Sequence, residues 1–187
     1  MRPEQLPARP ECPEPGRWMA PDGDATELDV SRLIGALVIA LKPDYVIETG
    51  AYRGDTTEII GHALAFLGRG RLLSVEIDET RAAVVRQRVS GLPVTVVTGK
   101  AEDVMPDSPV DMLFVDSALD ARMREVRAFR PYALPRCVIL AHDSALPTYE
   151  PGVSEFFASM TAAVDDGIVQ PWMRLPTPRG LAITRYR

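Results

Sequence analysis

Short β-prone runs alternate with segments of helical periodicity along most of this chain, and this alternation is the feature that most restricts its fold. Apolar residues at helical spacing predict helices, and short apolar or β-branched runs predict strands. The expected strands are 45–47, 71–77, 94–98, 112–115 and 138–141, and the expected helices are 27–41, 56–67, 79–89, 122–130 and 153–164. Strands that alternate with helices favour a parallel sheet, because the helices provide the crossovers.

The order of elements changes near the C-terminus. Segments 168–175 and 181–186 are both β-prone, and they flank the turn 176–180, which contains proline and glycine. This pattern predicts an antiparallel hairpin at the edge of the sheet. We therefore predict an α/β fold that is Rossmann-like and doubly wound, with a mostly parallel seven-stranded sheet and an antiparallel C-terminal hairpin.

The chain length favours one domain. Its 187 residues, 46% of them hydrophobic, are enough for one well-buried core. Residues 1–17 contain five prolines and no periodicity, so we expect a flexible proline-rich tail. Residues 18–187 are then a single domain.

Composition argues against several partners. The chain has 26 acidic and 21 basic residues, a net charge of -5, which does not favour nucleic acid. The longest apolar run, 33–41, is about half of the roughly 20 residues of a membrane span. Prolines and acids stand where a secretory signal would have an apolar segment, so we expect a cytoplasmic protein. Cys12 and Cys137 suggest neither a disulfide framework nor a cysteine metal site, and the sequence does not indicate an oligomeric state.

The end of the first expected strand carries the first candidate ligand site. Ligands of open parallel sheets bind beyond the carboxyl ends of the strands. Residues 48–56 read ETGAYRGDT, whose glycines are four apart and do not match the G-x-G-x-x-G of a dinucleotide site. Gly50 would let a ligand approach the backbone, Gly54 would let the helix pack, and Glu48 would face a cation. The alternative is an ordinary strand-to-helix turn that happens to contain two glycines.

Acidic residues also follow the second and third expected strands. Glu76 ends one strand and could accept two hydrogen bonds from a ribose, while Ile77 could cover one face of a purine. Glu102 or Asp103 could meet an adenine amino group. The alternatives are a helix cap after the second strand and a solvated loop after the third.

These motifs resemble those of class I methyltransferases that use S-adenosylmethionine, above all the small catechol O-methyltransferase type, with the caffeoyl-CoA type as a relative. The similarity runs from Trp18 to the C-terminus. It implies that the segment around Trp18 and Met19 folds over the cofactor, and that Tyr52 and Thr56 help to hold its methionine carboxylate. The cofactor-binding residues that it implies are Trp18, Met19, Glu48, Gly50, Tyr52, Gly54, Thr56, Glu76, Ile77, Glu102 and Asp116.

Two further strand ends carry candidate catalytic residues. Asp116 follows the fourth strand, and His142 and Asp143 follow the fifth. Two carboxylates at adjacent strand ends can share Mg²⁺, and in the family this pair binds magnesium together with an Asn, whose position Ser144 takes here. The family's catalytic lysine is replaced by Leu119. His142 is the other candidate base, or else a loop histidine that bonds to the backbone.

The functional hypothesis is an S-adenosylmethionine-dependent methyltransferase that methylates an oxygen of a small molecule. The catalytic candidates are Asp116, His142 and Asp143, and the candidate magnesium ligands are Asp116, Asp143 and Ser144. Two alternatives are a protein that binds the cofactor without methyl transfer, and a nicotinamide-dependent oxidoreductase. The sequence does not identify the methyl acceptor.

Overall fold

The computed structural model describes residues 4–5, 18–144 and 151–187, with side chains from 18 to 144 and from 154 to 187. Most of the expected tail, 1–17, lies outside the described residues. Two of its residues form strand β1 (Glu4–Gln5), which pairs antiparallel with β2 (Met19–Ala20). The domain boundary after residue 17 stays an expectation from the sequence.

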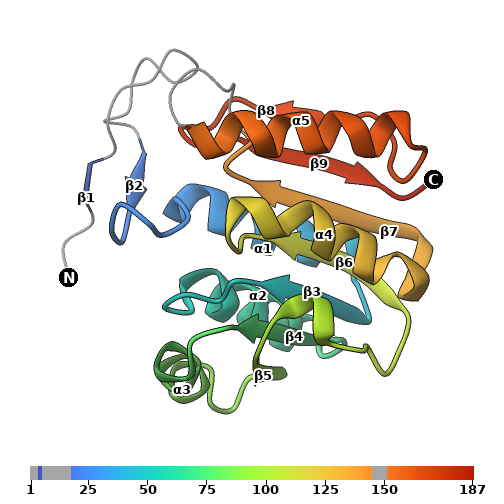
Figure 1. The fold of residues 1–187 in the computed structure, drawn as a ribbon. Helices are drawn as coiled ribbons and strands as arrows, with labels where there is room; N and C mark the ends of the chain where they lie inside the picture. Colours follow the sequence, from blue (N-terminus) through green and yellow to red (C-terminus); the bar gives the residue numbers. More distant parts are fainter. Residues whose placement is uncertain (1–3, 6–17, 145–150) are drawn as a thin grey trace.

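A seven-stranded sheet forms the centre of the molecule (Figure 1), and it confirms the predicted fold. Its strands lie in the order β5-β4-β3-β6-β7-β9-β8. The first five strands of that order are parallel, and β9 is antiparallel to both β7 and β8. The strands are β3 (Tyr45–Thr49), β4 (Arg71–Glu76), β5 (Val94–Thr98), β6 (Val110–Val115), β7 (Ala133–His142), β8 (Met173–Leu175) and β9 (Leu181–Arg185).

Helices cover both faces of this sheet because its central strands are apolar on both faces. Val46 packs in the cluster with residues of α1 and α2, and its neighbour Ile47 packs in the cluster with residues of α4 and α5. The helices are α1 (Leu28–Leu41), α2 (Asp55–Leu67), α3 (Glu79–Arg88), α4 (Leu119–Phe129) and α5 (Pro151–Asp165). Within the described parts of the chain, no helix is both long and apolar enough to cross a membrane.

Two strands begin more than two residues away from their predicted starts. β7 begins at Ala133 and passes through Pro135, where its pairing with β6 shifts register between Val110 and Met112. Proline lacks a backbone donor, so it fits a strand at such an irregularity. Segment 168–175 is strand only in its last three residues, since Pro171 interrupts the pairing and leaves a single bridge from Val169 to Tyr186.

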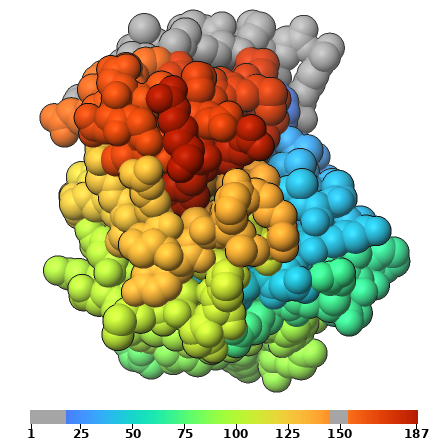
Figure 2. All heavy atoms as spheres, turned by 90° about the vertical axis from the view of Figure 1, so that its right-hand side faces the viewer, coloured from blue at the N-terminus to red at the C-terminus, as the bar shows by residue number. Residues whose placement is uncertain are grey.

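The topology fixes the place of a ligand site. The chain runs outward from β3 to β4 and β5, and then returns to the other side of β3 with β6. Thr49 and Val115 are register partners at this reversal, and the Asp116 amide donates to the Thr49 carbonyl at 2.9 Å. Carboxyl ends at such a reversal are the usual ligand site of open α/β sheets. The C-terminal residues lie on the opposite side of the molecule, on the face shown in Figure 2.

Candidate active site

Two cavities meet at the carboxyl ends of the strands. The larger, of about 620 Å³, lies beyond β3, β4, β5 and β6, and the smaller, of about 40 Å³, lies between the start of α2 and the segment before α1. Asp24, Gly50, Tyr52 and Asp116 line both of them. The two cavities can therefore hold two parts of one ligand.

Gly50 directly follows β3 and lies against the backbone that follows β6. Its φ is +81°, and a Cβ atom added there would lie 2.5 Å from the Asp116 carbonyl oxygen and 2.8 Å from the Ser117 Cα. Only glycine meets both conditions without strain. The sequence predicted a close backbone approach at Gly50. In the structure Gly50 is in close contact with the residues that follow β6, and it lines both cavities.

Glu76 is buried at the end of β4 and lines the larger cavity. Its Oε2 accepts from the Tyr52 amide at 2.7 Å and its Oε1 from the Asp78 amide at 3.0 Å. A carboxylate has about four acceptor positions, so each oxygen can still accept a hydroxyl. The same cavity is lined by Ile77 and Glu102. Ile77 is 67% exposed, and Glu102 pairs with Arg124 at 2.6 Å.

Glu48 is buried and lines the smaller cavity. Its Oε2 accepts hydroxyl hydrogen bonds from Thr57 at 2.7 Å and Ser74 at 2.6 Å. Burial raises the pKa of Glu48 to about 7 against the lowering effect of these two bonds, and the charges of Asp116 and Glu76 add to the rise. Thr56 lines the same cavity and shares a 2.9 Å hydrogen bond with Ser31.

The raised pKa predicts a stability that falls with pH. Between its ordinary value of 4.5 and about 7, the folded protein keeps the Glu48 proton that the unfolded chain releases. The free energy of unfolding should therefore fall as pH rises through this range, by roughly 3 kcal/mol in total. Glu48→Gln cannot release a proton and should lack this part of the decline. Urea unfolding of both proteins at pH about 5 and about 8 measures the difference.

The matched control for this experiment is Glu58→Gln, because Glu58 of α2 is partly exposed and pairs with Arg88. It should follow the wild-type pH dependence closely. Parallel pH dependences of wild type and Glu48→Gln would show that Glu48 titrates normally.

Not every expected cofactor residue reaches a cavity. Trp18 and Met19 are described, yet neither lines either cavity, and Trp18 packs on the apolar cluster around α1 and α2. Gly54 also lies outside both linings, and a Cβ there would contact Val85 of α3 at 3.1 Å. The segment after Trp18 approaches the site instead: Asp22 pairs with Arg53 at 2.5 Å.

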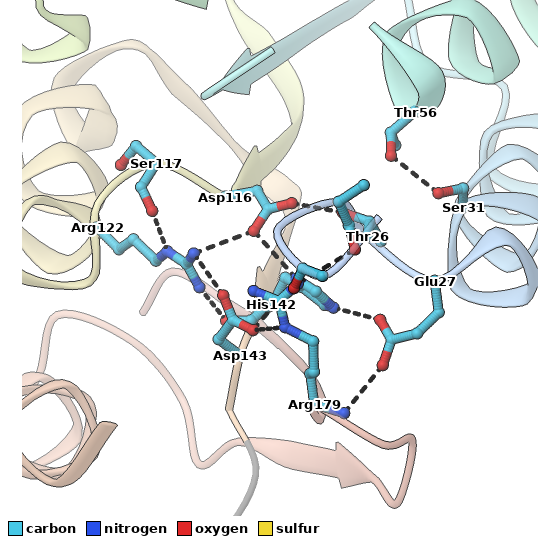
Figure 3. A network of polar contacts seen from close by, with 12 residues as sticks. Thr26, Glu27, Ser31, Thr56, Asp116, Ser117, Arg122, His142, Asp143 and Arg179 are labelled. Carbon is cyan, nitrogen blue, oxygen red and sulfur yellow. Dashed lines mark hydrogen bonds and ion pairs between the residues drawn. The ribbon is translucent and has the colours of Figure 1, made fainter. Parts of the chain in front are cut away.

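His142 is fully buried between carboxylates (Figure 3). Its Nε2 lies 2.6 Å from Glu27 Oε2 and its Nδ1 lies 3.1 Å from Asp116 Oδ1. Burial alone would lower its pKa, but Asp116, Asp143 and Glu27 raise it to about 10. Because ionised carboxylates only accept hydrogen bonds, both ring nitrogens carry protons. The hypothesis that His142 is the catalytic base does not fit these contacts, and His142 lines neither cavity.

Arg122 of α4 lies between the two candidate metal ligands. Its Nη2 donates to Asp116 Oδ1 at 3.0 Å and to Asp143 Oδ2 at 2.8 Å. Its Nε donates to the Ser117 carbonyl at 2.8 Å, and its Nη1 donates to the His142 carbonyl. The side chain is 3% exposed, so the guanidinium is a buried part of the site.

Arg179, in the turn before β9, lies on the other side of Asp143. Its Nε donates to Asp143 Oδ1 at 2.5 Å, and its Nη1 donates to the Ala25 carbonyl at 3.1 Å. Its backbone amide donates to Glu27 Oε1 at 2.9 Å. The Thr26 hydroxyl completes the network by donating to Asp116 Oδ2 at 2.5 Å.

The predicted magnesium site does not fit this network. Ligand atoms of Asp116, His142 and Asp143 lie within 4.8 Å of one another, as a metal site requires. All four oxygens of Asp116 and Asp143, however, accept hydrogen bonds from Thr26, Arg122, His142 or Arg179. The Nη2 atom of Arg122 lies between the two carboxylates, where a cation shared by both would have to lie. The Ser144 hydroxyl, the expected third ligand, is buried, lines neither cavity and has no hydrogen-bond partner among the described residues.

The charges of the network are balanced as well. Glu27, Asp116 and Asp143 bring three negative charges, and Arg122, Arg179 and protonated His142 bring three positive ones. A divalent cation would add two uncompensated charges to a buried cluster, which is costly.

The sequence of the region just described matches a protein-family model described as a methyltransferase domain. The match covers residues 47–144, just over half of the chain, and it includes the ends of β3, β4, β5, β6 and β7. The chain belongs to the methyltransferase domain family. The described cavities of this methyltransferase domain therefore lie within or beside the matched region.

One curated relative is a ribosomal RNA methyltransferase. The chain is 25% identical over 111 residues to ribosomal RNA large subunit methyltransferase E of Methanosphaera stadtmanae. The aligned stretch covers 57% of this chain and 53% of the relative. The chain thus spans about half the length of this curated relative.

Solved structures with this fold include O-methyltransferases. An O-methyltransferase from Bacillus cereus in complex with SAH is similar with a TM-score of 0.75 and 16% identity, over 89% of this chain and 84% of that one. TomG is an O-methyltransferase of Streptomyces achromogenes that is involved in tomaymycin synthesis and was solved in complex with SAM. It is similar with a TM-score of 0.70 and 17% identity, over 84% of this chain and 79% of TomG. At these identities the likeness establishes a common fold.

Sequence reasoning missed four polar residues of the methyltransferase domain's network, namely Thr26, Glu27, Arg122 and Arg179. A signal exists for one of them. Arg122 precedes Met123 and lies four residues before Val126 in the buried stripe of α4. A charged residue inside an apolar stripe needs a buried partner, and Asp116 at the preceding strand end is the natural candidate. Thr26, Glu27 and Arg179 come from segments whose approach depends on tertiary structure.

Proposed function

We propose that this methyltransferase domain binds S-adenosylmethionine across the two cavities and transfers its methyl group to an oxygen of a small molecule. The observation that carries this proposal is the junction at Gly50, where acids from three neighbouring strand ends surround a close backbone approach. Glu48, Glu76 and Asp116 are those acids. The methionine part belongs in the smaller cavity and the adenosine in the larger one.

The larger cavity offers groups that suit an adenosine. Glu76 is held by two backbone amides and keeps free acceptor positions for the two ribose hydroxyls. Ile77 covers one face of the purine, and the Glu102 carboxylate accepts a hydrogen bond from the amino group of the adenine.

The smaller cavity offers groups that suit an amino acid. The carboxylate of Glu48 faces the ammonium, and Tyr52 and Thr56 hold the carboxylate end. Removing either charged partner from a buried pair of this kind is costly. The cavity therefore favours a ligand whose charges complement its own.

S-adenosylmethionine supplies an electrophilic methyl group on a sulfonium, so the protein's work is alignment, exclusion of water and removal of one proton. As the acceptor oxygen forms its bond to the methyl carbon and the carbon–sulfur bond breaks, the acceptor loses its hydroxyl proton. Asp116 is the group that we assign to accept it, because its side chain is 14% exposed at the junction of both cavities. His142, which holds two protons, positions Asp116.

A small-molecule acceptor has more support than RNA. The relative named for ribosomal RNA shares only about half its length with this chain, and the net charge of -5 does not favour a phosphate backbone. O-methylation has the support of the structural neighbours named as O-methyltransferases.

Glu76→Ala should weaken binding of S-adenosylmethionine about 5- to 150-fold, because two buried ribose hydroxyls lose their acceptor, at a cost of roughly 1 to 3 kcal/mol. Isothermal titration calorimetry of both proteins measures the change. Glu79→Ala is the matched control, since Glu79 is exposed, pairs with Arg86 and lines neither cavity. Equal affinity of wild type and Glu76→Ala would remove Glu76 from the site, and no binding by wild type would refute the proposed function.

Turnover separates transfer from simple binding of the cofactor. Incubation with labelled S-adenosylmethionine and a panel of phenols, alcohols and carboxylic acids should release the demethylated cofactor with at least one acceptor. Asp116→Asn should bind the cofactor but lose most of this turnover, roughly 100-fold or more for a lost general base. Cofactor binding without turnover on any acceptor would favour a binding protein.

A further inference from the structure

One guanidinium nitrogen bridges the two acids that end neighbouring strands. Asp116 follows β6 and Asp143 follows β7, and Arg122 Nη2 lies 3.0 Å from the first and 2.8 Å from the second. A bridging cation would have to lie in contact with the same two carboxylates. Arg122 therefore occupies the position that the sequence assigned to a metal ion (Figure 3).

Arg122 donates hydrogen bonds to oxygen atoms of four residues, and its guanidinium carbon lies 5.4 Å from the centre of the Phe156 ring. Besides the two carboxylates, the carbonyl oxygens of Ser117 and His142 accept from its Nε and Nη1. Carboxylate and carbonyl oxygens are also the ligands that hard divalent cations prefer. The guanidinium is thus held by four acceptors that, without it, would suit a metal ion.

We propose that Arg122 is a built-in substitute for a divalent cation, so that this site positions Asp116 and performs methyl transfer without a metal ion. The inference rests on the proposed function and specifies how its site is neutralised. Arg179 assists, because its Nε holds the second oxygen of Asp143 at 2.5 Å. Arginine suits this task, since it stays charged at all physiological pH values and bonds several planar acceptors at once.

The wild-type protein should show no saturable binding of Mn²⁺ in calorimetry and no change of its thermal midpoint with Mn²⁺ or Mg²⁺. In Arg122→Ala, four oxygen atoms lose a donor, and Asp116 and Asp143 lose the cation that lies between them, although His142 and Arg179 remain beside them. This variant should gain Mn²⁺ binding, and a saturating concentration should raise its Tm by about 3 °C or more. A purely structural role of Arg122 would destabilise the variant without creating this dependence on the cation.

Arg127→Ala is the matched control, because Arg127 lies on the same helix, is exposed and pairs with Asp166. It should behave like wild type in both measurements. If Arg122→Ala does not fold without Mn²⁺, refolding in the presence of Mn²⁺ replaces the Tm measurement, and recovery of folded protein supports the inference.

Two results would overturn the inference. One is stoichiometric Mn²⁺ binding by wild type that Asp143→Asn abolishes, and the other is an Arg122→Ala variant that ignores Mn²⁺ in every measurement. Titration of the same wild-type samples with S-adenosylhomocysteine tests the proposed function separately. Cofactor binding together with Mn²⁺ binding would contradict only the metal-free site, whereas absence of cofactor binding would contradict the proposed function itself.

Discussion

Gly50→Ala should abolish most cofactor binding and destabilise the fold. The added Cβ would lie 2.5 Å from the Asp116 carbonyl oxygen in a backbone conformation with a φ of +81°. Neither backbone can move freely, because Gly50 directly follows β3 and Asp116 directly follows β6, two central strands of the sheet. We expect a loss of roughly 2 to 4 kcal/mol in the free energy of unfolding, from the left-handed conformation and from overpacking. Displacing the junction of the two cavities should weaken binding of S-adenosylhomocysteine by about 100-fold or more.

Gly68→Ala separates conformational strain from crowding. Gly68 also has a positive φ, +62°, but a Cβ there would meet nothing within 4 Å. It should cost roughly 1 kcal/mol and leave cofactor affinity unchanged. Urea unfolding measures the stability of the two variants, and calorimetry measures their affinity for S-adenosylhomocysteine. If Gly50→Ala bound it with wild-type affinity, the cofactor would not bind at the junction of the two cavities.

Asp143→Ala should be the most damaging change in the charged network. It removes the carboxylate that faces both Arg122 and Arg179 and lies 3.6 Å from the His142 ring. The buried guanidinium of Arg122 and the partly buried guanidinium of Arg179 then lose a partner, for which the expected cost is about 3 to 5 kcal/mol. Urea unfolding at neutral pH measures it.

Asp166→Ala is the comparison for that experiment. Asp166 pairs with Arg127, and both side chains are largely exposed, so its loss should cost less than about 1 kcal/mol. Similar stability of the two variants would show that Arg122 and Arg179 find solvent or other partners when Asp143 is absent.

Periodicity predicted the elements of this fold because each buries a regular set of apolar residues. The helix expected at 27–41 is observed at Leu28–Leu41, and the strand 94–98 has the expected bounds. Proline explains the two largest differences between the predicted and the observed strands. Pro135 lies in a strand where the pairing shifts register, and Pro171 interrupts an apolar run that would otherwise be strand. Both effects depend on which neighbour a strand meets, and a local pattern does not contain that information.

Site residues could be predicted where the topology alone places them. Four candidate residues lie at or directly after the ends of parallel strands, so any correct assignment of those strands brings them to one edge of the sheet: Glu48, Gly50, Glu76 and Asp116. The partners of His142 could not be predicted in this way. Its role changes from base to doubly protonated group because Glu27, 115 residues away in sequence, lies 2.6 Å from its ring.

The hydrogen bond from the Arg179 amide to Glu27 joins residues separated by 152 positions. Contacts this distant in sequence close the largest loops and therefore tend to form late in folding. A ribosome releases Arg179 only after nearly all of the sheet has been synthesised. The nascent chain thus contains all five parallel strands before its charged network can be complete. We expect the ability to retain cofactor to appear as the last step of maturation, when the two distant ends of the domain have met.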